Sequence, residues 1–131
     1  AIAIPQYQDY IARTQVSEAM TLLGGARTAI EESVSQEGAF PDVGDDLNTD
    51  FGIKDSGKYV DTLTVTAAAA DAGSIQAKFK GSGVSKKLQG LVIQFSRDTN
   101  ANWSCDPKDT GTNVEQKYLP KTCAPAPAAG T

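Results

Sequence analysis

Apolar residues recur along the first third of the chain with the spacing of an α-helix. They come every three or four positions, which places them on one helix face: Ala12, Val16, Ala19, Leu23, Ala26, Ile30 and Val34. We therefore predict a long helix within residues 1–36, ending near Gly38 and about 46 Å long over residues 6–36. It is too long for a domain of this size to cover. The pair Gly24 and Gly25 predicts either a bend or the close approach of another backbone.

The helical pattern stops after the first third of the chain. Residues 37–58 are rich in Pro, Gly, Asp and Asn, and we predict a long loop there. A few apolar side chains could attach this loop to a core: Phe40, Val43, Leu47, Phe51 and Ile53.

Strand patterns follow within residues 59–105. We predict strands at residues 59–66, 74–80 and 88–96, and a short fourth strand at 102–105 that carries Trp103 to the sheet edge. Turn residues at 71–73 and 81–83 favour an antiparallel meander. The predicted fold is α+β and fills residues 1–131 as one domain, with a long N-terminal helix packed on a four-stranded antiparallel sheet.

Composition excludes several kinds of chemistry. The 131 residues include no histidine, so Ser-His-Asp and Cys-His hydrolases, His-ligated zinc sites and haem proteins are excluded. A net charge of −4 argues against polyanion binding as the main activity. The stretch Gly81-Ser82-Gly83 lacks the spacing and the Lys-Ser/Thr ending of a P-loop. We predict no enzyme activity and no cofactor.

Acidic and basic residues are separated along the chain. Residues 31–50 hold seven acids and no base, whereas residues 78–97 hold five bases and no acid. These stretches are either two solvated surfaces or complementary surfaces of stacked copies. Residues 46–52 resemble the start of a calcium loop, but Phe51 and Gly57 stand where an EF-hand needs Gly and Glu. An irregular calcium site or a merely acidic loop is left, and we predict no metal.

Two cysteines lie 18 positions apart, at Cys105 and Cys123. They form either one disulfide, in an oxidising compartment, or two buried thiols of a cytosolic protein. The polar, turn-rich stretch between them favours the disulfide. Residues 124–131 read as a flexible low-complexity tail. The sequence contains neither a visible signal peptide nor an apolar run of about 20 residues, so we expect an extracellular chain that has lost its N-terminus.

Two stretches carry a family resemblance. Residues 1–20, AIAIPQYQDYIARTQVSEAM, resemble the helix of Gram-negative type IV pilins of the Pseudomonas type, just after their membrane segment. Residues 119–123, LPKTC, resemble the end of that family's disulfide-bounded D-region. The resemblance implies a major structural subunit that starts in the inner membrane. In that family the N-terminal residue of the membrane segment is methylated, and this residue is not carried over to the present sequence. Assembly machinery then polymerises the subunit into extracellular pilus fibres for adhesion, twitching motility, phage attachment and DNA uptake. We expect this chain to be truncated and monomeric.

The resemblance also implies roles for individual residues. Pro5 matches the proline that kinks the helix, and the cysteines match the D-region disulfide. The enclosed loop matches one that binds host-cell glycolipid receptors, with these candidate contacts here: Asp106, Lys108, Tyr118, Pro120 and Lys121. Thr131 is a candidate for O-glycosylation. Candidate contacts between neighbouring copies come from the charged stretches: Glu31, Glu32, Asp45, Asp46, Lys86 and Lys87.

Two other functions remain open at the level of sequence. A type II secretion pseudopilin shares this helix but has a calcium site in place of the disulfide loop, so the cysteine pair argues against it. An extracellular carbohydrate-binding module would need an exposed aromatic platform. The candidates for such a platform are Trp103 and Tyr118, in a chain with only 7% aromatic residues.

Overall fold

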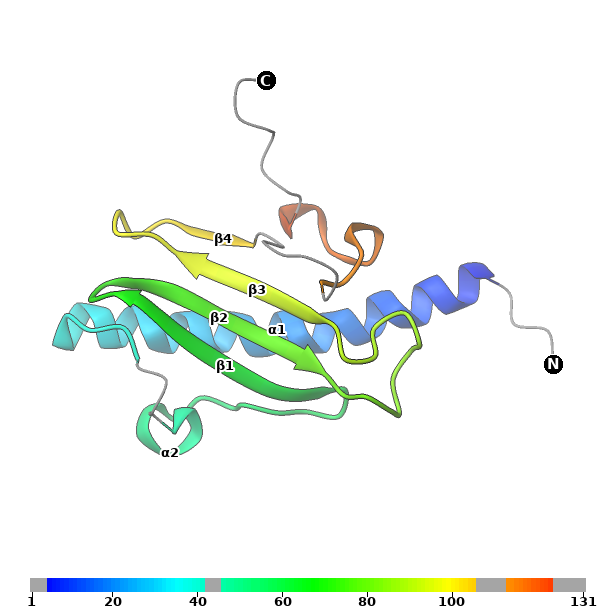
Figure 1. Ribbon diagram of the computed structural model, residues 1–131, viewed down its shortest axis with the longest axis horizontal. Helices are drawn as coiled ribbons and strands as arrows, with labels where there is room; N and C mark the ends of the chain where they lie inside the picture. Colours follow the sequence, from blue (N-terminus) through cyan, green and yellow to red (C-terminus); the bar gives the residue numbers. More distant parts are fainter. Residues whose placement is uncertain (1–4, 42–45, 106–112, 124–131) are drawn as a thin grey trace, which may run out of the picture.

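One long helix forms the spine of the molecule (Figure 1). The computed structural model describes residues 5–41, 46–105 and 113–123. Helix α1 spans Pro5–Glu37, and six of the seven residues of its predicted apolar face are at most 1% exposed: Ala12, Val16, Ala19, Leu23, Ala26 and Ile30. The helix ends at Gly38, which has a φ of 69° and donates its N–H to the carbonyl of Val34, as expected for a left-handed C-terminal cap.

Helix α1 continues through Gly24 and Gly25 without interruption. Nothing lies within 4 Å of a Cβ built on either glycine. The prediction that another backbone approaches here is therefore wrong, and the alternative of a bend stays a prediction.

The sheet is the predicted antiparallel meander, with strand order β1-β2-β3-β4. Its strands are β1 (Val60–Ala69), β2 (Ala72–Phe79), β3 (Val92–Arg97) and β4 (Trp103–Cys105). Alternate side chains point toward α1 and form the core with it: Leu63, Val65, Ile75, Ala77, Phe79, Ile93 and Phe95. The predicted class, a long N-terminal helix on a four-stranded antiparallel sheet, is confirmed.

Several bounds differ from the prediction. Strand β1 continues past residue 66 to Ala69 and β2 begins at Ala72, so the turn lies at residues 70–71 and not at 71–73. Strand β3 begins at Val92 rather than at residue 88, because Leu88 and Leu91 belong to turns in which Leu88 N–H bonds to Ser85 O and Leu91 N–H to Leu88 O. Leu88 is fully buried all the same. The loop predicted at residues 37–58 contains a short helix, α2 (Leu47–Phe51), while Phe40, Leu47 and Ile53 are buried as anchors. Val43 lies outside the described residues.

Several polar side chains of α1 fasten the helix to the rest of the fold, among them Gln15, Glu18 and Glu31. Gln15 Oε1 accepts the N–H of Ser85 at 2.8 Å. The Glu18 carboxylate accepts the N–H groups of residues 58, 59 and 60 at 2.7, 2.7 and 3.1 Å. Glu31, further along the helix, binds side chains of β3 and β4. The helix is thus tied to the β2–β3 connection, to the start of β1 and to the last two strands.

Candidate functional site

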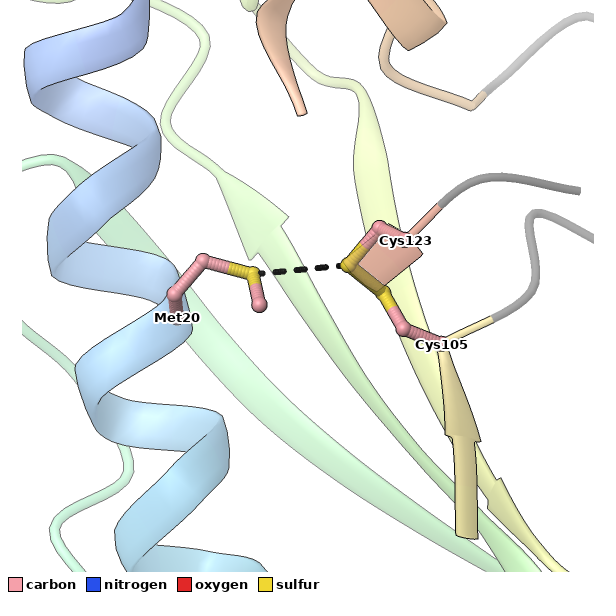
Figure 2. The surroundings of a disulfide bond; sticks show 3 residues. All are labelled: Met20, Cys105 and Cys123. Atoms are coloured by element: carbon pink, nitrogen blue, oxygen red, sulfur yellow. Dashed lines mark hydrogen bonds between the residues drawn. A yellow bond between two sulfur atoms is a disulfide. The ribbon is translucent and has the colours of Figure 1, made fainter. Parts of the chain in front are cut away.

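The two cysteines form the predicted disulfide at the end of the chain. Cys105 ends β4 and Cys123 belongs to the short 3-10 helix η2 (Lys121–Cys123), with their Cα atoms 4.6 Å apart. Cys123 is fully buried. Figure 2 shows its sulfur facing Met20 of α1, with the two sulfur atoms 3.9 Å apart. A disulfide sulfur carries no proton, so this contact is packing, and together with the disulfide it holds Cys123 against both the sheet and the helix.

The segment that leads to Cys123 is attached to the sheet before it reaches the disulfide. Asn113 forms a parallel bridge with Val92, and the N–H of Val114 donates to the carbonyl of Val92 at 3.0 Å. Val114 is 2% exposed. After Val114 the chain forms another 3-10 helix, η1 (Gln116–Tyr118), which precedes η2 and packs on α1. The described part of this loop is therefore held in one conformation by its contacts with the sheet and with α1.

Tyr118 differs from its predicted role as a receptor contact. Its side chain is only 1% exposed, and its hydroxyl donates to Asp9 Oδ1 at 3.2 Å. The Lys117 ammonium lies 5.1 Å from the centre of its ring, and the pKa of Lys117 is raised by the Tyr118 hydroxyl and then by the Asp9 carboxylate. Tyr118 joins the loop to α1, and its ring does not face a receptor.

An open groove of about 450 Å³ runs between α1 and this segment. Its lining is mainly apolar, with one arginine: Arg13, Val16, Ser17, Met20, Thr21, Tyr118, Leu119 and Pro120. Arg13 Nε donates to the carbonyl of Lys117 at 3.2 Å. Pro120 and Lys121 are exposed at the edge, whereas the candidate contacts Asp106 and Lys108 lie outside the described residues.

Glu31 was predicted to contact a neighbouring copy, but it binds residues of its own chain. Its Oε1 pairs with Arg97 Nε at 2.5 Å and accepts the indole N–H of Trp103 at 2.5 Å. Arg97 also donates to the carbonyl of Asp71. These two donors, the guanidinium of Arg97 first, hold the pKa of Glu31 below its usual value. This acid therefore serves the fold itself, by neutralising a buried arginine.

Sequence reasoning missed this pair although a signal was present. Inward-facing positions of β3 alternate, so the face that carries Ile93 and Phe95 continues to residue 97. An arginine there is 8% exposed and requires a carboxylate partner. Trp103 is occupied as well, because it binds Glu31 and its ring packs on Phe40 with centroids 6.4 Å apart. Trp103 and Tyr118 thus form no exposed platform for a sugar.

Asp46, predicted as a subunit contact or as part of a calcium loop, caps α2. Its Oδ1 accepts the N–H groups of Asn48 and Thr49 at 3.0 and 3.1 Å, while its own N–H donates to Asp50 Oδ2 at 2.9 Å. The Thr49 amide, as the first cause, lowers the pKa of Asp46. Asp45 is outside the described residues. Over the described ranges, no three Asp, Glu, Cys or His residues are grouped to hold a metal.

The remaining charged candidates lie at the surface. Lys86 and Lys87 are exposed in the connection between β2 and β3, and Glu32 is exposed on the last turns of α1. Figure 1 places that connection beside the N-terminal half of α1, while the end of α1 and α2 lie at the opposite end of the long axis. Helix α1 begins at Pro5, so the predicted kink stays a prediction, and Thr131 is not among the described residues.

Two exposed tyrosines were not singled out from the sequence. Tyr7 and Tyr10, on the first turns of α1, are 63% and 64% exposed, the two large apolar side chains most open to solvent among the described residues. Their exposure could have been predicted, because neither tyrosine lies on the apolar helix face that begins at Ala12. No helix in the described part of the chain combines the length and apolar character needed to cross a membrane.

Comparison with known proteins identifies the family. The family model for pilins, described as bacterial filament proteins, matches residues 12–124. Fimbrial protein EcpC of Eikenella corrodens is 38% identical over 126 residues, covering 94% of this chain and 77% of that protein. Type IV major pilin protein PilE1 of Neisseria gonorrhoeae is 34% identical over 152 residues, covering 98% and 79%.

A third relative extends the similarity to another genus. Type IV major fimbrial protein FimA of Dichelobacter nodosus is 35% identical over 135 residues, covering 94% of this chain and 83% of that protein. The matched region includes α1 from residue 12 onward, the sheet and the disulfide-bounded segment. The chain therefore belongs to the type IV pilins, structural subunits and not enzymes, which assemble into extracellular pilus fibres.

Proposed function

We propose that this chain is the major subunit of its pilus and that the first turns of α1 are buried against other copies in the fibre. The observation that carries this proposal is the exposure of Tyr7 and Tyr10, 63% and 64%, on turns that precede the buried face of the helix. Exposed aromatic rings on an otherwise ordered helix gain stability when a partner covers them. Neighbouring copies of α1 supply such a cover, because like helices pack along their apolar stripes.

The test uses the protein expressed from its own gene in the producing bacterium. Replacing both rings by serine (Tyr7→Ser with Tyr10→Ser) is expected to abolish or sharply reduce surface fibres seen by electron microscopy. The purified chain should keep its melting temperature, because neither ring contributes to the core. The matched control, Tyr7→Phe with Tyr10→Phe, should assemble normally. Normal fibres in the serine variant would contradict the proposal.

The assignment as major subunit has its own measurement. Fibres sheared from the cell surface and analysed by mass spectrometry should contain this chain as their most abundant protein. The assignment is supported by the printed names of the relatives from Neisseria gonorrhoeae and Dichelobacter nodosus, which describe major pilin and major fimbrial proteins. Finding it at trace level would make it a minor subunit. The Pseudomonas-like subtype stays a prediction.

We also propose the activities that follow from a retractable surface fibre. These are adhesion, twitching motility, phage attachment and DNA uptake, after an inner membrane stage and polymerisation by assembly machinery. Deleting the gene should abolish spreading on agar, phage sensitivity and transformation together, and complementation should restore all three. Survival of any one of them without fibres would remove that activity from the proposal.

Receptor contact is proposed for the rim of the disulfide-bounded segment. Exposed Pro120 and Lys121 support it, because they are accessible and held in place by η2. Binding of intact fibres to surfaces coated with neutral glycolipid should weaken in Pro120→Ala with Lys121→Ala and stay unchanged in Lys54→Ala, which changes an exposed lysine elsewhere. Equal binding by both would contradict the contact. Modification of Thr131 by a glycan is tested by the intact mass of the native protein.

A further inference from the structure

A basic groove lies between the first turns of α1 and the β2–β3 connection. It has a volume of about 460 Å³ and is lined by Gln8, Ile11, Ser85, Lys86 and Lys87. The backbone under the two lysines is held in place, because Ser85 N–H donates to Gln15 Oε1 at 2.8 Å and Lys87 N–H donates to Ser85 Oγ at 3.2 Å. Leu88, the next residue, is buried in the core. The groove thus presents two ammonium groups beside an apolar floor at Ile11.

An acidic groove lies where the end of α1 meets α2. Its volume is about 270 Å³, and it is lined by Ala29, Glu32, Ser33, Gln36, Glu37, Asp50 and Phe51. Here too the backbone is fixed, since Ser33 Oγ donates to the carbonyl of Ala39 at 3.3 Å and Asp46 caps α2. Glu32 and Glu37 are exposed, whereas Phe51 is half-buried and forms an apolar floor.

The two grooves face the same flank of α1 and lie far apart along it. Ile11 and Ser33 are 22 residues apart, about six helical turns and about 33 Å. Their charges are too distant to neutralise each other within one chain, because screening in physiological salt acts over about 8 Å. In the described segments, ion pairs join only Glu31 to Arg97 and Glu115 to Lys117, so neither groove uses its charges internally there.

We propose that the basic groove of one copy docks on the acidic groove of a second copy of this chain. The contact is head-to-tail, with the copies displaced by about 33 Å along the helix direction. It rests on the proposed role as a fibre subunit. The predicted contacts Glu31 and Asp46 serve the fold, and Glu37 takes their place beside Glu32. Contacts between two different surfaces generate open filaments instead of closed dimers.

The two grooves have complementary charges, which makes a second copy of this chain the matching occupant. The rim of one groove carries lysines and the rim of the other carries acids. Each groove also has an apolar floor, Ile11 in the basic groove and Phe51 in the acidic groove. Exposed ion pairs are individually weak, but they exclude wrong registers because like charges repel. The proposed contact therefore sets which part of one globular domain lies against which part of the next.

Crosslinking in assembled fibres tests the contact directly. The variant Lys87→Cys with Glu37→Cys, expressed from its own gene in the producing bacterium, is treated with a short bismaleimide; the native cysteines are disulfide-bonded and do not react. We expect a ladder of covalent multimers after denaturation. The control, Lys87→Cys with Thr64→Cys, pairs the same lysine position with an exposed residue on the outer face of β1 and should remain monomeric. Intact fibres without a ladder would overturn the contact but leave the role as pilus subunit standing.

Charge reversal gives an independent readout if a cysteine variant fails to assemble. Lys87→Glu and Glu37→Lys are each expected to lower the yield of sheared fibres by about fivefold or more, because like charges then face each other. The two changes combined should recover most of the yield, since the opposite pairing is restored. Purified single variants should melt like the unmodified chain. Unchanged yield in both single variants would also overturn the contact. The variants at Tyr7 and Tyr10 test a different statement, the role of this chain as a fibre subunit.

Discussion

The carboxylate of Glu18 lies against Gly57 so closely that no side chain fits between them. A Cβ built on Gly57 would stand 2.5 Å from Glu18 Oε1, while that carboxylate accepts the three successive N–H groups that follow Gly57. The absence of a side chain at one position thus allows an acid of α1 to reach the backbone at the start of β1.

Replacing Glu18 by glutamine should destabilise the fold without changing its shape. The amide NH₂ would face backbone N–H donors and leave at least one unsatisfied, so the free energy of unfolding should fall by about 1–3 kcal/mol. Urea denaturation at neutral pH measures the change. The control, Glu37→Gln on the exposed end of α1, should stay within about 0.5 kcal/mol of the unmodified chain. Equal effects of the two variants would contradict a special role for Glu18.

Gly57→Ala should destabilise through Glu18. The new methyl would displace the carboxylate from its amides, at a cost of about 1–3 kcal/mol. In a Glu18→Ala background the carboxylate is already gone, and the same substitution should cost less than half as much. A double-mutant cycle in urea therefore yields a coupling free energy in the range of about 0.5–3 kcal/mol. A coupling near zero would locate the strain elsewhere.

Gly73 in β2 is a second position where a side chain is excluded. A Cβ there would stand 2.5 Å from the carbonyl oxygen of Thr66 and 2.7 Å from Phe40 Cε1. Gly73→Ala should lower the free energy of unfolding by about 1–3 kcal/mol, because a strand carbonyl does not retreat as a flexible side chain does. Gly81→Ala is the matched control, since nothing lies within 4 Å of its Cβ position. A thermal melt that separates the two variants supports this reading, and identical melts contradict it.

The Glu31–Arg97 pair should make stability depend on pH. The pKa of Glu31 is lowered from an ordinary value of 4.5 by Arg97 and Trp103. Its contribution is therefore complete above about pH 4.5 and is lost as pH falls through the lowered pKa. Glu31→Gln should be less stable than the unmodified chain at pH 7, and the gap should narrow as the pH falls below 4.5 and Glu31 becomes protonated. The control Glu32→Gln should show no such convergence in urea titrations, and a pH-independent gap for Glu31→Gln would contradict the pairing.

The disulfide should contribute through the chain it closes. Cys105 and Cys123 are 18 residues apart. Closing a loop of that size lowers the entropy of the unfolded chain and so raises the free energy of unfolding by about 3 kcal/mol. The variant Cys105→Ser with Cys123→Ser should lose about this amount in urea unfolding. The unmodified chain measured in strong reductant is the control and should match the variant. If both retain the stability of the oxidised chain, the disulfide does not support the fold.

Local periodicity made much of the fold predictable, and its failures have physical causes. The face of α1 was readable because one partner, the sheet, covers it along its length. Leu88 was predicted to lie in a strand because apolar spacing indicates which residues are buried. It does not indicate whether their backbone hydrogen bonds form a strand or a turn. The α2 helix was missed because only five residues form it, too few for periodicity to show.

The surface was less predictable than the core. Tyr118 lies in a polar stretch that reads as exposed, yet it is buried against α1, and the partner of its hydroxyl, Asp9, is 109 positions away in the sequence. A run of acids likewise does not reveal which member turns inward, and only the buried side chain of Arg97 identifies Glu31. Contacts of such long range are fixed by the assembled fold and leave little trace in local sequence.

Three of the attachments of α1, through Gln15, Glu18 and Glu31, have a mechanical consequence. They are spread over 16 positions, about 24 Å of helix, and each reaches a different part of the fold. A pull applied to the first turns of α1 along its axis loads all three at once, in shear. A sideways pull loads them one after another, as in peeling. The fold should therefore withstand a pull along the axis of α1 better than a pull across it.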